Sequence, residues 1–81
     1  MLNILSSTAP AIGGFVVTPN DSVDLEQPIR ALTINVAGTV SFIGTDGLTN
    51  TTDTLPAGTY ALFATRIRST GTTATGLTGW V

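Results

Sequence analysis

The middle of the chain alternates between apolar and polar residues, and this alternation limits the folds open to it. Leu32, Ile34 and Val36 are separated by single polar residues, and the same parity returns at Val40 and Phe42. A period of two is that of a β-strand with one buried face, because successive side chains point to opposite sides. The pattern predicts two strands within residues 30–42, paired as a hairpin across an Ala-Gly turn.

Clusters of turn-forming residues divide the rest of the chain into short segments. We expect strands at residues 15–18, 59–68 and 77–81, and a loop or solvated hairpin tip at residues 45–54. No segment has a helical period with caps. The predicted fold class is all-β: a small antiparallel β-sandwich or barrel of about six short strands.

The strand expected at residues 59–68 carries bulky side chains on both faces. Tyr60 and Leu62 share one parity, and Phe63 and Ile67 share the other. We expect one face to pack on the core of the subunit and the other on a neighbouring sheet or subunit.

Residues 1–14 show no alternation long enough to place them in this core. We predict an extended N-terminal arm at residues 1–14, followed by a single β domain at residues 15–81. Leu2, Ile4 and Leu5 supply the apolar side chains of the arm. The arm is expected to lie on a neighbouring subunit or on a larger shell, because termini are ordered only where something ties them down.

The chain is short and poor in charge, which favours association. A chain of 81 residues has a thin core, and small domains usually add disulfides, a metal or copies of themselves. Cys and His are both absent, and charged residues are 10% of the chain against a usual value of about 25%. We therefore expect binding to copies of itself. The net charge of −2 and the lack of a long apolar run argue against nucleic acid and membrane as partners.

The composition also argues against an enzyme. Nucleophilic catalysis needs a base within reach of the nucleophile, and the chain has no His, Cys or Lys. The tightest acidic cluster, Asp21, Asp24 and Glu26, is interpreted as a solvated turn. We expect no catalytic residue, no cofactor and no metal. A weak calcium hypothesis remains for Asp46, Asn50 and Asp53, whose spacing does not match a calcium-binding loop.

Besides Leu2, Ile4 and Leu5 of the arm, four residues of the β domain are candidates for an interface. Arg66 and Arg68 stand two residues apart on one expected strand, so they project from the same face. They either pair with acids of their own subunit or anchor a carboxylate or carbonyl of a neighbour. Tyr60 and Trp80 are expected to pack in the core or an interface, with stacking on a sugar as the alternative.

Five segments, in this order and spacing, give the chain a resemblance to a known family. They are Val17-Thr18-Pro19-Asn20-Asp21-Ser22, Ile29-Arg30-Ala31-Leu32, Gly38-Thr39-Val40-Ser41-Phe42, Leu55-Pro56-Ala57-Gly58-Thr59 and Arg66-Ile67-Arg68-Ser69-Thr70-Gly71-Thr72-Thr73-Ala74. The layout resembles the head-spike base proteins of phages and gene transfer agents. The departures from the family pattern are the Thr-rich loop at residues 45–54 and the arm.

This resemblance implies a non-enzymatic virion structural protein on the capsid surface. Such a protein, a head-spike base or a decoration protein, would associate with copies of itself, dock on the major capsid protein and anchor a spike or fibre. The alternatives are a carbohydrate-binding or host-recognition β module, which would use Tyr60 or Trp80, and a tail-attached structural protein.

Overall fold

A computed structural model describes residues 13–81, which form seven strands and no helix. The described residues therefore contain no helix that could cross a membrane. The expected all-β class is confirmed, with one strand more than the six predicted. The strands are β1 (Gly14–Val17), β2 (Ile29–Val36), β3 (Ser41–Ile43), β4 (Thr49–Thr51), β5 (Gly58–Ala64), β6 (Arg66–Arg68) and β7 (Thr75–Trp80).

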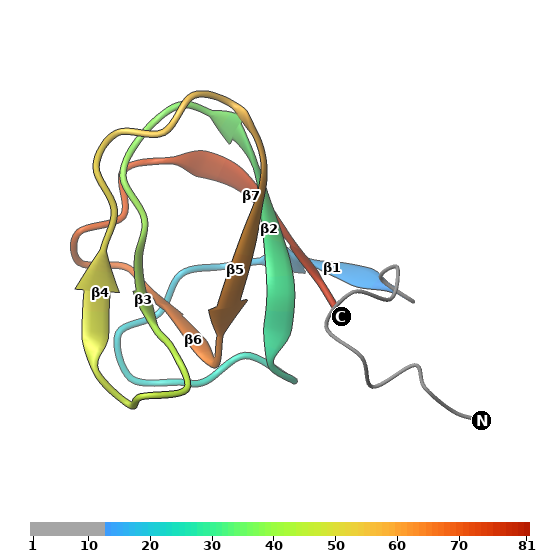
Figure 1. Cartoon of the computed structure of the whole chain (residues 1–81), viewed down its shortest axis with the longest axis vertical. Helices are drawn as coiled ribbons and strands as arrows, with labels where there is room; N and C mark the ends of the chain where they lie inside the picture. The colour runs from blue at the N-terminus through green and yellow to red at the C-terminus, as the bar shows by residue number, and fades with distance from the viewer. Residues whose placement is uncertain (1–12) are drawn as a thin grey trace.

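The strands form two antiparallel sheets that enclose a small core (Figure 1). One sheet has four strands in the order β1-β7-β2-β5, and the other has three in the order β4-β3-β6. Apolar side chains from both sheets meet between them and are almost completely buried. This core comprises Val17, Ile29, Leu32, Ile34, Val40, Ala64, Ile67, Ala74 and Leu77.

The predicted hairpin within residues 30–42 is wrong. β2 pairs with β5 and β7, whereas β3 pairs with β4 and β6 in the other sheet. The chain crosses between the sheets at residues 37–40, where Gly38 forms an isolated bridge with Leu55. The alternation correctly placed Leu32, Ile34 and Val40 in the core, but it was wrong for Val36, the last residue of β2, which has 56% of its surface exposed. It could not identify the partner strand, because strands from opposite layers present their apolar faces to the same core.

The single strand expected at residues 59–68 is two strands, β5 and β6. The chain leaves the four-stranded sheet at Thr65, whose N–H donates to the Ile43 carbonyl of the other sheet at 2.8 Å. The break reverses the alternation, so Ala64 and Ile67 are both buried. Ile67 therefore joins the core, and Phe63 stays on the outside with 47% of its surface exposed.

The two ends of the described chain lie side by side in one sheet. β1 pairs with β7, and the Val81 N–H continues this pairing by donating to the Gly13 carbonyl at 2.8 Å. The strands expected near residues 15–18 and 77–81 are thus confirmed as β1 and β7. β1 begins at Gly14, the last residue of the predicted arm, and arm residues 1–12 lie outside the described residues.

β3, β4 and the turn of residues 44–48 between them form a hairpin with a solvated tip, one of the two structures expected for residues 45–54. β3 and β4 are antiparallel, with Ile43 opposite Thr49 and Ser41 opposite Thr51. Asp46 Oδ1 closes the turn by accepting from the Leu48 N–H at 2.9 Å. Leu48 projects from the turn with 64% of its surface exposed.

Candidate functional site: two outer sheet faces

The calcium hypothesis placed three oxygen-bearing side chains around one loop, and the structure engages each of them locally. Asp46 accepts from the Leu48 N–H, and Asn50 donates to the Leu48 carbonyl. Asp53 accepts from the Thr54 N–H at 2.8 Å, on the far side of β4. Within residues 13–81, no three acidic side chains gather where they could hold a metal ion.

Arg66 and Arg68, on β6, face the loop of residues 20–25. Arg66 Nε lies 2.9 Å from Asp24 Oδ1, and Arg66 Nη1 donates to the Asp21 carbonyl at 3.1 Å. Arg68 Nε lies 3.8 Å from Asp21 Oδ1. Both side chains keep about a quarter of their surface exposed. The structure therefore shows the intrachain pairing that was one of the two expectations for these arginines.

Asp21 is held by a further pair of hydrogen bonds. The Thr70 N–H donates to Asp21 Oδ1 at 2.8 Å, and the Thr70 hydroxyl donates to Oδ2 at 2.6 Å. These bonds favour the ionised carboxylate, so they lower the pKa of Asp21, with a smaller contribution from the positive charge of Arg68. Two acids of the predicted turn, Asp21 and Asp24, thus fasten the loop to β6. Glu26 lies outside this set of contacts and borders a shallow pocket.

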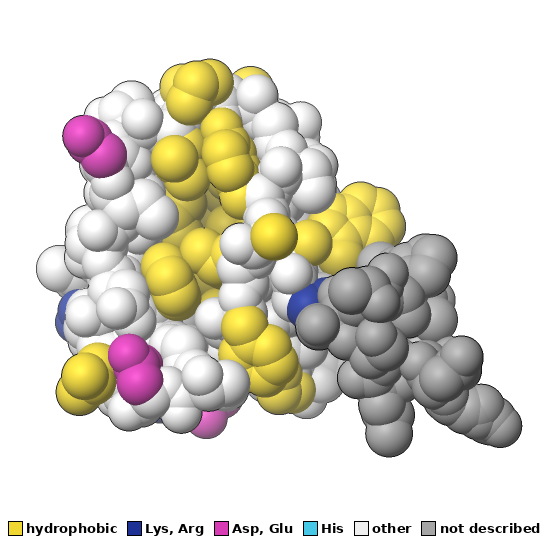
Figure 2. All heavy atoms as spheres, viewed as in Figure 1, with side chains coloured by type: hydrophobic (Ala, Val, Ile, Leu, Met, Phe, Trp, Pro, Cys, Tyr) yellow, Lys and Arg dark blue, Asp and Glu magenta, His cyan; other side chains and the backbone are white. Residues whose placement is uncertain are grey.

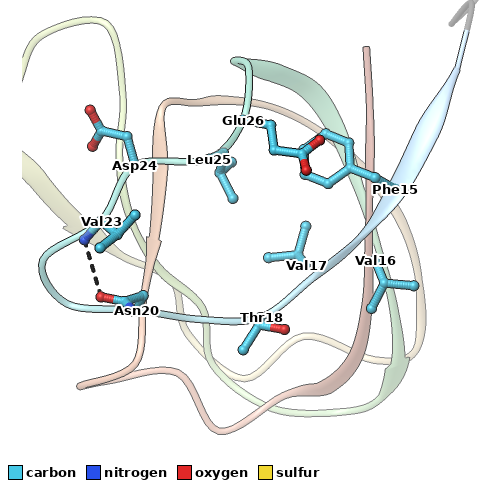
Figure 3. Close-up of a pocket in the computed structure, with 9 residues that line it drawn as sticks. All are labelled: Phe15, Val16, Val17, Thr18, Asn20, Val23, Asp24, Leu25 and Glu26. Carbon is cyan, nitrogen blue, oxygen red and sulfur yellow. Dashed lines mark hydrogen bonds between the residues drawn. The ribbon is translucent and has the colours of Figure 1, made fainter.

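This pocket lies between β1 and the same loop (Figure 3). Val17 and Leu25 point into it from opposite sides, whereas Val16 points away. The Val23 N–H donates to Asn20 Oδ1 at 3.1 Å and closes the bend of the loop. The lining mixes apolar side chains with polar ones, and two of the polar side chains, Asn20 and Asp24, are already engaged within the chain. We interpret it as incomplete packing between strand and loop.

The outer face of the four-stranded sheet carries two rows of uncharged side chains. One row crosses all four strands in register, from Gly14 through Trp80 and Ala31 to Ala61. A second row crosses them from Val16 through Thr78 and Thr33 to Thr59. None of these eight residues is charged. We call these two rows, together with Phe63 in β5, the neutral face.

Trp80 lies across the centre of the neutral face. A Cβ at Gly14 would stand 2.7 Å from Trp80 Cε3, so the absence of a side chain at Gly14 lets the indole rest over β1. The indole Nε1 donates to Thr33 Oγ1 at 2.9 Å, and this oxygen is 2.6 Å from Thr59 Oγ1. The hydrogen bonds fix the ring in one orientation and extend across three adjacent strands.

Two exposed apolar side chains flank the indole at opposite edges of the sheet. Val16 in β1 has 80% of its surface exposed, and Phe63 in β5 has 47%. Exposed apolar groups on an uncharged surface are typical of protein interfaces. The neutral face is therefore suited to bind another protein surface, and it offers no nucleophile paired with a base.

The structure separates the interface residues that the sequence singled out. Trp80 lies on the neutral face, but Tyr60 turns inward and donates its hydroxyl to the Pro56 carbonyl at 2.6 Å. The arginines lie on the other sheet, and Leu2, Ile4 and Leu5 lie outside the described residues. Sequence reasoning did not single out Val16 as an exposed residue, because it stands within a run of three apolar residues. Val16 and Val17 are adjacent in a strand and therefore point to opposite faces, so placing Val17 in the core would have placed Val16 outside.

Comparisons with known proteins found one solved structure to report. No protein-family model matches the sequence, and none of the curated proteins matches it. A chain in the capsid of a native GTA particle, computed with C5 symmetry, is similar at 34% sequence identity with a TM-score of 0.83. The match covers 95% of this chain and 90% of that chain.

Proposed function

Because this chain belongs to the family of a chain in a gene transfer agent (GTA) capsid, we propose that it is a structural protein of a virion, placed at the capsid surface. The observation that carries the proposal is a 34% identity that extends over 90% of the GTA chain. The match extends over nearly the whole length of both chains, so the similarity is to a capsid component as a whole and not to one part of it. The proposed role is therefore non-enzymatic.

The finer role that we propose is a head-spike base or decoration protein. In this role the chain docks on the major capsid protein, associates with copies of itself and anchors a spike or fibre. The C5 symmetry of the GTA capsid structure supports repeated copies, since a symmetry axis repeats each chain around it. The low charge of this chain supports burial of much of its surface in such an assembly.

The neutral face is the docking surface that we propose. Burying uncharged side chains avoids the desolvation penalty of charged groups, and aromatic residues are enriched at the centres of interfaces. Trp80 has the position expected of such an anchor, with its N–H already satisfied by Thr33. Val16 and Phe63 would lie toward the edges of the contact.

The test is incorporation of variants into particles. Val16→Glu and Phe63→Glu would each place a charge in the contact, and we expect both to fold and to be lost from purified particles. Leu48→Glu is the matched control, because Leu48 is equally apolar and exposed but lies on the hairpin of the other sheet. Circular dichroism checks folding, and immunoblotting of purified particles measures incorporation. Normal incorporation of both face variants would contradict docking through this surface.

A second candidate function, binding of a carbohydrate, is favoured by one observation. The indole of Trp80 lies beside the hydroxyls of Thr33 and Thr59, and sugars are bound by aromatic rings with adjacent hydrogen-bonding groups. A glycan array with the wild-type chain and Trp80→Ala tests it. Binding that depends on Trp80 would favour this function, and absence of binding would leave capsid docking as the role of the face.

A further inference from the structure

The four edges of the two sheets differ in how they are protected. β4 and β6 have three residues each, and β1 has four. β5 has seven residues, Gly58–Ala64, and none of them is charged or Pro. Edge strands are normally shortened, charged or covered, because their free N–H and C=O groups pair readily with another chain. β5 is neither short nor charged, and no other strand of residues 13–81 pairs with its free edge.

The edge of β6 illustrates what β5 lacks. The loop of residues 20–25 runs along it, with the Asn20 N–H donating to the Ile67 carbonyl and the Leu25 N–H to the Thr65 carbonyl, both at 2.9 Å. Among residues 13–81, no comparable backbone bond reaches the free side of β5. Every other residue of β5 directs its backbone groups away from β2, so a row of donors and acceptors faces outward.

Apolar side chains are also left partly uncovered beside this edge. Figure 2 shows a band of hydrophobic side chains on the face where, in Figure 1, β5 lies opposite β3 and β4. Tyr60 and Leu62 of β5, Phe42 of β3 and Leu55 pack against the core but are only partly buried. A strand added along β5 would satisfy the backbone edge and cover this band.

We infer that the strand added to β5 is the segment of residues 1–12 from a neighbouring copy of the chain. The segment contains no charged side chain, and its apolar residues Leu2, Ile4 and Leu5 could cover an apolar surface. In an extended strand Leu2 and Ile4 would face the apolar band, with Asn3 and Leu5 on the side of the neutral face. This inference rests on the self-association proposed above and names the contact that produces it.

The topology explains why the donor is a neighbour. The segment precedes β1, and β1 and β5 are opposite edges of the same four-stranded sheet. A strand that continues from β1 leads away from the β5 edge of its own subunit. Twelve extended residues span about 40 Å, which matches the largest extent of the molecule, 38 Å, and is enough to reach the next copy. Each copy would donate at one edge and accept at the other, the head-to-tail arrangement that closes into rings.

Disulfide trapping tests this contact directly, because the chain has no cysteine of its own. Chains carrying Asn3→Cys are mixed with chains carrying Thr59→Cys, Ala61→Cys or Phe63→Cys, which sample three registers along β5. We expect mild oxidation to link Asn3→Cys to at least one of them, since opposed residues on paired strands bring their Cβ atoms to about 5 Å. Leu48→Cys, exposed on the other sheet, is the control that should not link.

Further outcomes would overturn the inference. Failure to link at all three positions, or a wild-type chain that stays monomeric, would contradict it. Rapid homodimers of Ala61→Cys alone would indicate pairing of β5 with β5 instead. A chain that carries Asn3→Cys together with one of the β5 cysteines is a further sample. If disulfides form only within such a chain, and not between chains with one cysteine each, the segment folds back on its own subunit. In parallel, hydrogen exchange of the β5 amides should lose protection when residues 1–10 are deleted. Absence of linkage with normal particle incorporation would reject this contact and leave the proposed function standing.

Discussion

Gly38 lies where the chain crosses from one sheet to the other, and its missing side chain allows a close backbone approach. A Cβ at this position would stand 2.4 Å from the Ala74 nitrogen and 2.7 Å from its Cα. Gly38 also exchanges two backbone hydrogen bonds with Leu55, at 2.9 and 3.1 Å. The glycine that the sequence suggested as part of a hairpin turn is instead a packing point between three segments.

Gly38→Ala is therefore expected to destabilise the fold by about 1–3 kcal/mol, the usual cost of overpacking, because backbone and not a flexible side chain must move. Urea unfolding followed by circular dichroism measures the change. Gly13→Ala is the control, since a Cβ there meets Val81 Cγ2 at an ordinary 3.7 Å. Equal stabilities of the two variants would show that the contact at Ala74 is not restrictive.

Asp21 gives the protein a pH dependence whose sign follows from its contacts. Because the bonds from Thr70 lower the pKa of Asp21 in the folded chain, the stabilisation is complete above the ordinary value of 3.8. It is lost as the pH falls below 3.8 through the lowered pKa of the folded state.

Replacing Thr70 should reduce this pH dependence. Thr70→Val removes the hydroxyl that donates to Asp21 Oδ2 and keeps the shape of the side chain. We expect the difference in unfolding midpoint between pH 5 and pH 3 to be smaller in the variant than in the wild type. Thr75→Val, an exposed threonine at the start of β7, is the control. An unchanged difference in Thr70→Val would assign the pH dependence to other acids.

At the scale of elements, β6 and the loop of residues 20–25 behave as one unit. The contacts of Arg66 and Arg68 join this three-residue strand to the loop, in addition to the two backbone hydrogen bonds from Asn20 and Leu25. Exposed ion pairs contribute only about 0 to 1 kcal/mol, so the arginines are not required for folding by their charge alone. Part of each side chain remains available to a neighbour.

Arg66→Ala and Arg68→Ala, made singly, separate the two roles of these side chains. Both variants should fold with losses of stability of about 1 kcal/mol or less. If either arginine also anchors a carboxylate or carbonyl of an adjacent subunit or capsid protein, that variant should be lost from particles while circular dichroism is unchanged. If both variants are incorporated normally, the two arginines contact only Asp21 and Asp24 of their own chain and do not anchor a neighbour.

The turn between β3 and β4 should accept inserted sequence. Its residues are exposed, and the turn contributes no side chain to the core. A short peptide tag inserted between Gly47 and Leu48 is expected to leave the unfolding midpoint and particle incorporation nearly unchanged. The same tag after Asn50 interrupts β4 and its pairing with Phe42, so it should destabilise the protein. A tag at Gly47 that blocks incorporation would show that the turn is an interface.

For the whole molecule, the core is too small to leave much margin of stability. Nine apolar residues are buried, and neither a disulfide nor a metal ligand set supplements them in the described chain. We expect the protein to form a closed oligomer at micromolar concentration or to be poorly soluble alone, as small domains without other supports do. Analytical ultracentrifugation measures the mass. A highly soluble monomer with a high melting temperature would contradict this expectation.

The sequence by itself determined the all-β class, the position of most strands and several of their inward-facing side chains, because alternation is a local property. It placed Leu32 and Ile34 in the core correctly. Only the tertiary structure decided which strands pair, that the chain changes sheets at Gly38 and Thr65, and that Tyr60 and Trp80 lie on different sides of their sheet. These features depend on contacts between segments far apart in the chain. The alternation that signals a strand is the same whichever layer the strand joins, so no local pattern could specify them.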